Sequence, residues 1–339
     1  MKLNSFSRRM AYLGAVPVVL GLIAVGAIAA DKKMPSEGTP VTKYKLVSDW
    51  QPAPLHPSPE WEMSAVTVSD DGTRVYATRR SDPPVLEIDA KTGRVLHEMA
   101  TGLLKWPHGI YYNKGFLWLG DESNGEVQWI GTHPVLKSAI DNGRGYQVLK
   151  ISTFGQPLLE IGTRGQKGKD DSHFTAPCAV IVNSAGDVFV IDGHGQNISD
   201  RVLKFTNDGK FIKSWGKTGT GPGEFSGPHA FAIDSKNRLL VSDRGNKRIQ
   251  IFDMDGKFIT EWKYPNNAVG FSGLAMLPDS RIIGTTKNKL QILDANTGAV
   301  VDEINETDAE GIAVDKDGNI YTAEVLGRRV LKFSPVAAR

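Results

Sequence analysis

Short apolar stretches with a period of two recur along the chain, separated by turns rich in glycine, aspartate and asparagine. The segment "AIDSKNRLLVSDRGNKRIQIFD" at 232–253 has the same order of features as "AVDKDGNIYTAEVLGRRVLKF" at 313–333 and "IVNSAGDVFVIDGHGQNISDRVLKF" at 181–205. Each holds a short apolar strand, a turn, a second strand that ends near an acid, a loop, and an alternating strand that begins with Arg-Val or Arg-Ile. Alternation of this kind, with turns every eight to twelve residues or so, predicts antiparallel strands.

The repeat of roughly 40 to 50 residues with four strands per unit is typical of a propeller blade. First strands are expected in six units, at residues 65–68, 109–112, 179–182, 230–233, 274–277 and 311–314. The sixth unit ends after its third strand, near Phe333, and its fourth strand is expected from "YKLVSDW" at 44–50, which resembles "KFIKSW" and "KFITEW". The sequence therefore predicts an all-β, six-bladed β-propeller over 41–335. The N-terminal strand completes the last blade and closes the ring, which removes open sheet edges.

The first 30 residues differ from the rest and predict an export signal. Basic residues precede an uncharged apolar run at 11–30 that contains Ala-Ile-Ala, a cleavage-site pattern. The run is 20 residues long, which is also enough for an uncleaved membrane anchor. We therefore expect an exported protein that is either periplasmic or tethered to the outer side of the membrane through 11–30. Residues 31–40 are expected to form a linker and 336–339 a short tail.

Charge and cysteine content narrow the classes of function. The chain has a net charge of +2 at pH 7, and three positive charges and no negative ones lie in the first 30 residues, so the remainder carries −1. This remainder has no basic excess to attract nucleic acid, and no nucleic-acid partner is expected. Cys178 is the sole cysteine, so the chain cannot form an intrachain disulfide.

Candidate metal ligands stand at the start of the predicted first strands. The first strand of each propeller blade lines the central channel, so residues at its start meet near the axis. His108 and His229 take this position in the second and fourth units, and Glu310 takes it in the sixth. Two imidazoles and a carboxylate from alternate blades suit Zn²⁺ with an open position, and they also suit non-haem Fe(II). The alternative is that each histidine caps its strand and bonds only to backbone. Cys178, in the third unit, is expected to be a buried thiol.

Further candidates lie where the second strands end. An acid recurs there in four units, as Asp121, Asp192, Asp243 and Glu324. This repetition indicates an acid that braces a loop by accepting backbone N–H bonds. Arg244 follows one of these acids, and the aligned place in the first unit is Arg79, beside Arg80. These arginines would either hold a substrate carboxylate on the channel face or form surface ion pairs. His194 lies in a longer loop of the third unit, with a site role and a surface role both open.

Together these residues resemble the NHL-repeat family and, within it, peptidyl-α-hydroxyglycine α-amidating lyase. The resemblance covers nearly the whole chain after the signal, and it is most specific at "WPHGI", "HFTAPCAVIV", "DVFVIDGHGQNISDRVLKF", "GEFSGPHAFAI" and "VSDRGNKRIQIF". It implies a six-bladed propeller that holds Zn²⁺ with three histidines from alternate blades. It also implies cleavage of the C–N bond of a peptide that ends in α-hydroxyglycine, giving a peptide amide and glyoxylate. On this resemblance His108 and His229 match zinc ligands, while Arg79 (or Arg80) and Arg244 match active-site arginines.

This sequence departs from the family pattern at three positions. Glu310 stands where the third zinc histidine is expected, which adds a negative charge and leaves the metal open between Zn²⁺ and Fe(II). His194 aligns with the family's active-site tyrosine and would be a base of much lower pKa. Gly311 aligns with a calcium-binding carboxylate, so a structural calcium ion is not supported.

We therefore expect a metal-dependent, lyase-like enzyme that cleaves a C–N bond in an α-hydroxyglycine-type or related small carboxylate. Its partner would be a small molecule or a peptide C-terminus. The expected metal ligands are His108, His229 and Glu310, and the expected catalytic residues are Arg79, Arg244 and His194. The alternative is a non-catalytic NHL propeller that serves as an extracytoplasmic binding platform. Six-bladed lactonases, which use acidic and asparagine ligands around calcium, fit least because the channel mouth lacks that set.

Overall fold

The computed structural model describes residues 43–53, 62–122, 129–130, 133–134, 143–194, 199–264, 270–305 and 308–336. Every regular element within these ranges is a β-strand, which confirms the all-β prediction. No described element is a helix long and apolar enough to span a membrane. The predicted signal at 1–30, the linker at 31–40 and most of the tail at 336–339 lie outside the described residues.

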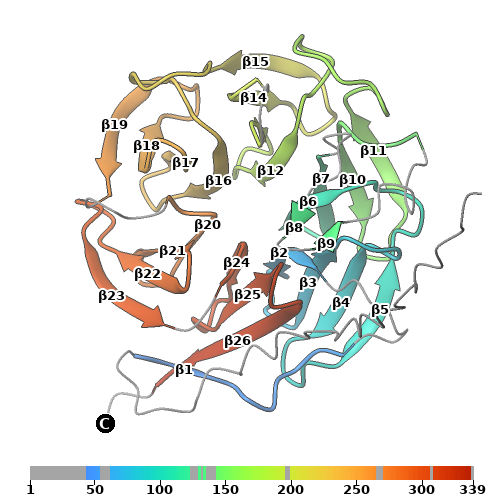
Figure 1. Ribbon diagram of the computed structural model, residues 1–339, viewed down its shortest axis with the longest axis vertical. Coiled ribbons are helices and arrows are strands. Elements are labelled where there is room, and N and C mark those ends of the chain that lie inside the picture. The colour runs from blue at the N-terminus through green and yellow to red at the C-terminus, as the bar shows by residue number, and fades with distance from the viewer. Residues whose placement is uncertain are drawn as a thin grey trace, which may run out of the picture. The chain divides into compact units, whose positions relative to one another are not determined.

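Six four-stranded sheets surround a central axis and confirm the six-bladed propeller (Figure 1). Blade 1 contains β2 (Met63–Val68), β3 (Arg74–Arg79), β4 (Val85–Asp89) and β5 (Val95–Met99). Blade 2 contains β6 (Pro107–Asn113), β7 (Phe116–Asp121), β10 (Gln147–Ser152) and β11 (Pro157–Ile161). The short paired strands β8 (Trp129–Ile130) and β9 (His133–Pro134) come between β7 and β10 in the chain. Blade 3 contains β12 (Pro177–Val182), β13 (Val188–Asp192), β14 (Arg201–Phe205) and β15 (Phe211–Trp215).

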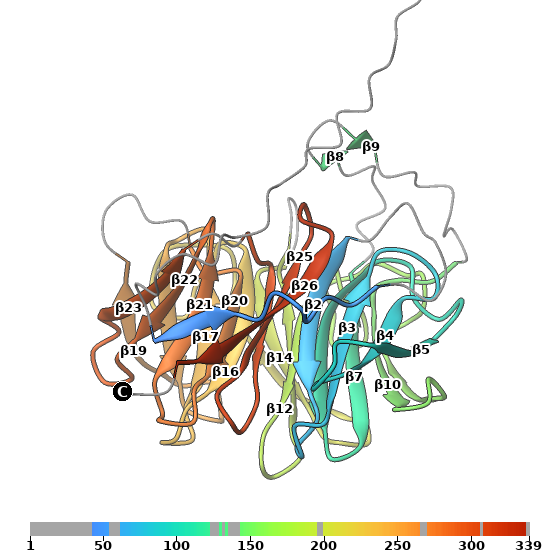
Figure 2. The ribbon, with the colours of Figure 1, turned by 90° about the horizontal axis from the view of Figure 1, so that it is seen from below.

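The remaining blades continue the same order around the ring. Blade 4 contains β16 (Pro228–Ile233), β17 (Leu239–Asp243), β18 (Arg248–Phe252) and β19 (Phe258–Lys263). Blade 5 contains β20 (Gly273–Met276), β21 (Ile282–Thr286), β22 (Lys289–Leu293) and β23 (Val300–Asn305). Blade 6 contains β24 (Gly311–Val314), β25 (Ile320–Glu324), β26 (Arg329–Pro335) and the N-terminal β1 (Tyr44–Leu46). Seen from the side, the inner strands run between the two faces of the ring (Figure 2).

The N-terminal strand closes the ring as the repeat pattern predicts. Tyr44 pairs with Pro335 and Leu46 pairs with Phe333, so β1 becomes the outermost strand of blade 6. Beyond β1 the chain turns toward blade 1, where the indole of Trp50 donates a 3.0 Å hydrogen bond to the carbonyl of Ala90. The ring of Trp50 also packs against that of Tyr321 in blade 6, with 5.4 Å between the ring centroids. One short segment therefore joins the last blade to the first.

The apolar core lies between neighbouring blades, because each blade places large buried side chains against the next. The cluster between blades 6 and 1 unites Val66 and Val75 with Tyr321 and Val330. The inner strands approach too closely for side chains at some positions. A Cβ atom on Gly109 would lie 2.5 Å from the carbonyl oxygen of Cys178 in the next blade.

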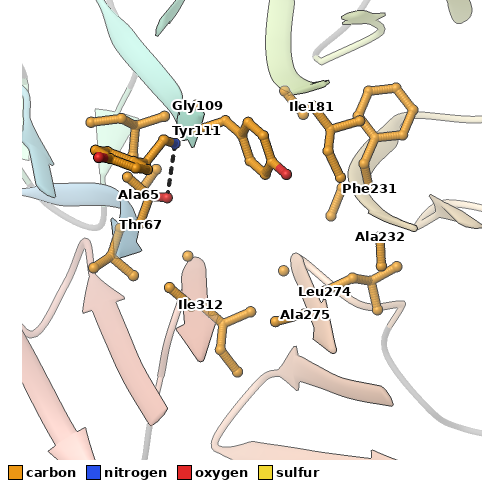
Figure 3. Close-up of a pocket in the computed structure, with 18 of the residues that line it drawn as sticks. Ala65, Thr67, Gly109, Tyr111, Ile181, Phe231, Ala232, Leu274, Ala275 and Ile312 are labelled. Carbon is orange, nitrogen blue, oxygen red and sulfur yellow. Dashed lines mark hydrogen bonds between the residues drawn. The ribbon is translucent and has the colours of Figure 1, made fainter. Parts of the chain in front are cut away.

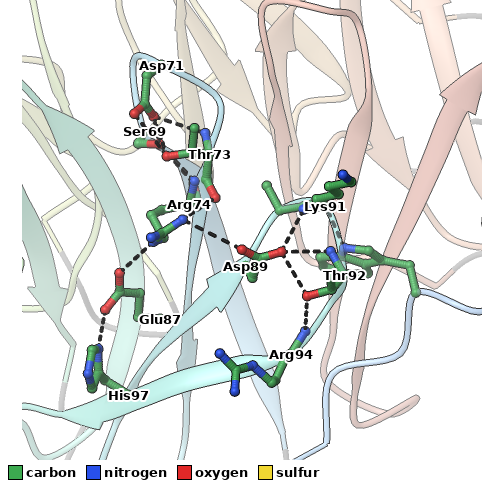
Figure 4. A network of polar contacts seen from close by, with 12 residues as sticks. Ser69, Asp71, Thr73, Arg74, Glu87, Asp89, Lys91, Thr92, Arg94 and His97 are labelled. Carbon is green, nitrogen blue, oxygen red and sulfur yellow. Dashed lines mark hydrogen bonds and ion pairs between the residues drawn. The ribbon is translucent and has the colours of Figure 1, made fainter.

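The outer part of blade 1 shows how polar side chains complete a blade (Figure 4). Asp71 accepts hydrogen bonds from Ser69 and Thr73 in the turn between β2 and β3, and these bonds lower its pKa to about 2. Across the sheet, Glu87 bonds to His97 with 2.5 Å between Oε2 and Nδ1. The side chain of His97 is 63% exposed, so this carboxylate–histidine pair belongs to the surface.

Candidate functional site

The predicted metal ligands His108 and His229 occupy the same irregular position in their blades. The register of β6 with β7 shifts between Pro107 and Gly109, and that of β16 with β17 shifts between Pro228 and Ala230. Each histidine is thus the extra residue of a β-bulge, a feature that redirects a side chain and is frequent next to active sites. The same shift places Ser64 in blade 1 and Cys178 in blade 3 at equivalent bulges. The first strands of these blades consequently begin two residues earlier than the sequence pattern predicts.

Both histidines use one ring nitrogen to bond to the next blade. The Nδ1 atom of His108 lies 3.0 Å from the carbonyl oxygen of Cys178, and that of His229 lies 2.6 Å from the carbonyl oxygen of Ser272. A carbonyl can only accept, so Nδ1 carries the proton and Nε2 keeps its lone pair. Both Nε2 atoms are buried, and neither accepts a hydrogen bond from a donor among the described residues. Each side chain therefore presents the neutral nitrogen that a metal ion requires.

Glu310 brings a carboxylate to these nitrogens from the start of β24. Its Oε1 atom lies 3.0 Å from Nε2 of His229 and 3.7 Å from Nε2 of His108. The backbone of Glu310 is held by a bond from its N–H to the carbonyl of Ala323. The structure thus brings together the three residues that the sequence predicts as ligands.

His194 joins the same group, in a place that the sequence did not predict. One ligand-capable atom from each of four residues lies within 4.8 Å of the others, and the four are His108, His194, His229 and Glu310. We call these four residues the His–Glu cluster. The ring of His194 lies 4.5 Å from that of His108 and 5.0 Å from that of His229, measured between centroids. The sequence assigned His194 a catalytic role as a base, and it did not place this ring among the metal ligands.

Glu122 is the site residue that the sequence interpretation missed. Its Oε1 atom lies 2.7 Å from Nδ1 of His194, and its side chain is fully buried. Its other oxygen, Oε2, has no hydrogen-bond partner among the described residues and lies 3.8 Å from Nε2 of His108. The only signal in the sequence is a second acid directly after Asp121 at the end of β7.

Burial and charge lower the pKa values of His108 and His229, and charge lowers that of Glu310. Burial lowers the pKa of His108 well below its ordinary value, and repulsion from His194 and His229 adds to this effect. Burial, together with the positive charge of Arg244, lowers the pKa of His229 to about 4. Burial raises the pKa of Glu310, but attraction to His229, His108 and Arg244 outweighs it and holds this pKa well below its ordinary value. At neutral pH His108 and His229 therefore offer lone pairs, and Glu310 offers a negative charge.

The two predicted active-site arginines lie in different places. Arg244 borders the cluster, because its Nη1 atom lies 3.6 Å from Oε1 of Glu310 and its side chain is 30% exposed. Arg79 points the other way, across blade 1, where Nη2 pairs with Glu98 of β5 at 3.0 Å and the side chain is 1% exposed. The prediction that Arg79 faces the channel is therefore wrong in this structure.

Register explains the misplacement of Arg79. Arg79 pairs with Met63 at the same place where Asp243 pairs with Pro228, so Arg79 is equivalent to Asp243 and Arg80 is equivalent to Arg244. A shift of one residue along a strand reverses the face to which a side chain points. Arg80 packs over the ring of Trp106, and its positive charge contributes to the lowered pKa of His108.

Three of the four repeated acids, Asp121, Asp192 and Asp243, act as the loop braces that the sequence predicts. Asp121 accepts backbone N–H bonds from Lys105 and Trp106, and Asp192 accepts them from Thr175 and Ala176. In the fourth blade Asp243 accepts the N–H of Ser226 and also bonds to Arg248. The acids ending these second strands are therefore part of the support for the loops around the site.

Cys178 is buried and lies outside the His–Glu cluster, as expected for a buried thiol. Its Sγ atom lies 3.6 Å from the carbonyl oxygen of Pro228, and burial raises the pKa of the thiol well above its ordinary value. A thiol that keeps its proton is a poor metal ligand.

A channel lined by both polar and apolar residues extends from the cluster along the inner strands of the six blades. Its cavity volume is about 430 Å³, and His108, His229 and Glu310 form part of its wall. Side chains from all six inner strands surround the cavity, and Tyr111 points into it (Figure 3).

The donor set of the cluster fits a divalent transition metal. Neutral imidazoles suit zinc, iron and nickel, and a carboxylate suits the harder of these ions. Ligands about 2.0–2.1 Å from a common ion lie no more than roughly 4 Å apart, so a small contraction of the cluster would accommodate one. The buried Nε2 atoms, which accept no hydrogen bond from a donor among the described residues, are the observation that this assignment explains.

The fold and the site define a six-bladed β-propeller with a metal-compatible cluster at one end of its central channel. A family model named DUF5128 and described as a 6-bladed beta-propeller matches residues 170–302. The chain is 32% identical over 208 residues to human NHL repeat-containing protein 3, which covers 57% of this chain and 60% of that protein. The chain therefore spans less than two thirds of this relative. Its homologues include NHL-repeat proteins and amidating enzymes.

The amidating enzymes match over a longer part of the chain at lower identity. Mouse peptidyl-glycine alpha-amidating monooxygenase is 28% identical over 296 residues, covering 80% of this chain and 28% of that protein. The probable peptidyl-alpha-hydroxyglycine alpha-amidating lyase pgal-1 of Caenorhabditis elegans is 26% identical over 271 residues, covering 73% of this chain and 69% of that protein. A solved gluconolactonase from Xanthomonas campestris has a TM-score of 0.61 at 12% identity and covers 86% of this chain and 90% of its own. This last similarity reflects the fold alone.

Proposed function

We propose that the protein is a metal-dependent, lyase-like enzyme that cleaves the C–N bond of an α-hydroxyglycine-type substrate or a related small carboxylate. The observation that carries this proposal is the His–Glu cluster, whose ligand-capable atoms lie within 4.8 Å of one another. Buried polar atoms without hydrogen bonds cost free energy. A binding platform gains nothing from such atoms at the channel mouth, whereas a bound cation would satisfy them.

His108 and His229 would hold the cation through Nε2, and Glu310 would hold it through its carboxylate. When bound, a divalent cation supplies Lewis-acid chemistry at a substrate oxygen. Arg244 is partly exposed beside Glu310, so its guanidinium can bind a substrate carboxylate with two parallel hydrogen bonds. The burial of His108 and His229 excludes water from this side of the site.

The proposed reaction needs neither an oxidant nor a second substrate. The hydroxyl group of the substrate loses its proton, a C=O bond forms at that carbon, and the C–N bond breaks. The nitrogen takes up a proton, so the products are an amide and glyoxylate. The similarity to amidating lyases, at 26% identity to the nematode protein, supports this reaction class.

The test is release of glyoxylate from N-benzoyl-α-hydroxyglycine by protein loaded with Zn²⁺ or Fe²⁺. The spontaneous rate in buffer is subtracted, and metal content is measured by elemental mass spectrometry. We expect turnover by the wild type and its loss, together with the metal, in the His108→Ala/His229→Ala double variant. His97→Ala serves as the matched control, since this histidine lies on the surface of blade 1.

Two results would count against the proposal in different ways. A folded wild-type protein that binds no metal when Zn²⁺, Fe²⁺ and Mn²⁺ are offered would refute the metal site and favour the binding platform. One metal per chain without glyoxylate release would refute this substrate class while leaving the metal site in place.

A further inference from the structure

His194 and Glu122 form a buried pair beside the residues proposed to hold the metal. The two side chains come from different blades, since Glu122 follows β7 and His194 follows β13. We infer that His194 is a fourth metal ligand positioned by Glu122, so that the donor set consists of three imidazoles and one carboxylate and selects a six-coordinate cation such as Fe²⁺ or Mn²⁺. This inference rests on the metal site of the proposed function and replaces the role of His194 as a base.

The three imidazoles of the cluster share one pattern of bonding. In each ring Nδ1 is bonded to an oxygen outside the cluster, which belongs to Cys178, Ser272 or Glu122. This pattern leaves Nε2 as the atom that each ring can offer to a metal. The ring centroids are separated by 4.5, 4.9 and 5.0 Å, so the three rings form a nearly equilateral triangle. A base acting on the substrate would have no need of this equivalence.

Glu122 supplies the contact that metal-binding histidines usually have. Ligating histidines generally donate their second ring N–H to a carboxylate or carbonyl, which fixes the tautomer and raises the basicity of the ring. Glu122 is fully buried, and Oε1 lies 2.7 Å from Nδ1 of His194. Its second oxygen has no partner among the described residues and lies 3.8 Å from Nε2 of His108. A buried carboxylate aimed at this point is stabilised by a nearby cation.

Four protein ligands restrict the choice of metal. Zinc is four-coordinate in most proteins, and catalytic zinc sites keep one position open by using only three protein ligands. A tetrahedral ion bound by the whole His–Glu cluster would have no position for substrate. An ion that accepts six ligands would keep two positions, and iron and manganese accept such mixed nitrogen and oxygen donors. An enzymatic site with this donor set therefore favours a six-coordinate cation.

Cobalt provides a direct test, because the intensity of its visible absorption distinguishes four-coordinate from six-coordinate ions. Full-length apoprotein would be titrated with Co²⁺, and the wild type compared with His194→Ala and Glu122→Gln. We expect the weak absorption of a six-coordinate ion in the wild type. Glu122→Gln should lower affinity by roughly 10- to 100-fold, as loss of a carboxylate behind a ligating histidine does elsewhere. His194→Ala should lower affinity at least as much and alter the spectrum.

The surface pair on blade 1 offers a matched control. Glu87 and His97 make the same kind of contact, 2.5 Å apart, on the outer strands β4 and β5 of blade 1 (Figure 4). Glu87→Gln and His97→Ala should change neither the affinity for Co²⁺ nor its spectrum. Circular dichroism and thermal unfolding would establish that each variant is folded. If His194→Ala does not fold, Glu122→Gln still tests the inference, because glutamine has nearly the same shape as glutamate.

The outcomes separate this inference from the proposed function. Unchanged affinity and spectrum in His194→Ala, with loss of metal in His108→Ala, would overturn the fourth ligand and leave the proposed function standing. Intense absorption typical of four-coordinate Co²⁺ in the wild type would refute the inference that the metal is six-coordinate and keeps two positions open for substrate. Absence of any metal binding by the wild type would overturn the proposed function, and the inference with it.

Discussion

The Nδ1 atom of His229 lies 2.6 Å from the carbonyl oxygen of Ser272, the residue at the equivalent position one blade further around the ring. His108 makes the same contact with the carbonyl of Cys178 in its own neighbouring blade. His108 and His229 are therefore oriented by the next blade rather than by their own. The geometry of the site consequently depends on how closely the blades pack.

Enlarging Gly109 should disturb both the packing and the site. A Cβ atom on Gly109 would lie 2.5 Å from the carbonyl oxygen of Cys178, which is the oxygen that accepts the bond from His108. We expect Gly109→Ala to lower the free energy of unfolding by about 1–3 kcal/mol, the usual cost of overpacking. We also expect weaker metal binding, measured by Co²⁺ titration beside urea unfolding.

Gly221→Ala is the control for this effect. The nearest atom to its added Cβ is Oε2 of Glu224 at 3.1 Å, which is the end of a flexible side chain. Wild-type stability and metal affinity in Gly109→Ala would show that the blades can separate without affecting the site.

Removing the guanidinium of Arg244 should weaken substrate binding without removing metal. Its side chain is 30% exposed beside Glu310, and it is not a metal ligand. Hydrogen bonds to charged groups contribute about 1.5–3 kcal/mol, so KM for a carboxylate substrate should rise by roughly 10- to 100-fold in Arg244→Ala. The KM of Arg244→Lys should lie between that of the wild type and that of Arg244→Ala, because lysine keeps the positive charge but lacks the paired N–H donors. An unchanged KM would exclude Arg244 from carboxylate binding.

Replacing Arg79 should affect stability rather than catalysis. Arg79 and Glu98 are 1% and 2% exposed and lie 3.0 Å apart. Removing one member of a buried ion pair costs about 3–5 kcal/mol, because the other charge is left without compensation. We expect Arg79→Met to lower the midpoint of urea unfolding and the double variant Arg79→Met/Glu98→Leu to recover much of the loss. A raised KM in folded Arg79→Met would instead support the predicted role of Arg79 in binding a substrate carboxylate.

The N-terminal segment should be required for a stable ring. Trp50 is 2% exposed, bonds to Ala90 in blade 1 and packs on Tyr321 in blade 6. Trp50→Ala should cost about 3–5 kcal/mol, as expected for a large buried aromatic side chain. Deletion of all residues before 54 should in addition expose the edge of β26 and promote association, seen by size-exclusion chromatography. A monomeric deletion variant with wild-type thermal stability would contradict this role.

The repeat pattern was sufficient to predict the fold and the convergence of three site residues. The alternating strands and recurring turns align the blades, so the sequence alone places His108, His229 and Glu310 at one height. The closing strand was also predictable, because 44–50 resembles the outer strands of other blades. Only Tyr44–Leu46 of this segment is a strand, since Trp50 leaves the sheet to contact blade 1.

The remaining site residues lie where the repeat is broken. His194 belongs to a loop longer than its counterpart after Asp243, so alignment could not predict where its ring points. Glu122 holds the position that Arg80 and Arg244 hold in their blades, but it carries the opposite charge, so the repeat could not predict its contact with His194. The prediction for Arg79 failed for a different reason, because blade 1 has this arginine where blade 4 has Asp243, and matching it to Arg244 was wrong by one residue.

The residues at the start of the inner strands determine how the metal-binding donor set can change during evolution. Position for position, the blades present Ser64, His108, Cys178, His229, Ser272 and Glu310 at a single level. Ser64, His108, Cys178 and His229 are bulged residues that contribute little to their sheets, so a substitution there alters the donors at the axis while the ladders of hydrogen bonds remain intact. Single substitutions can therefore change the number of ligands, the net charge and the metal preference of the site while the propeller fold stays the same.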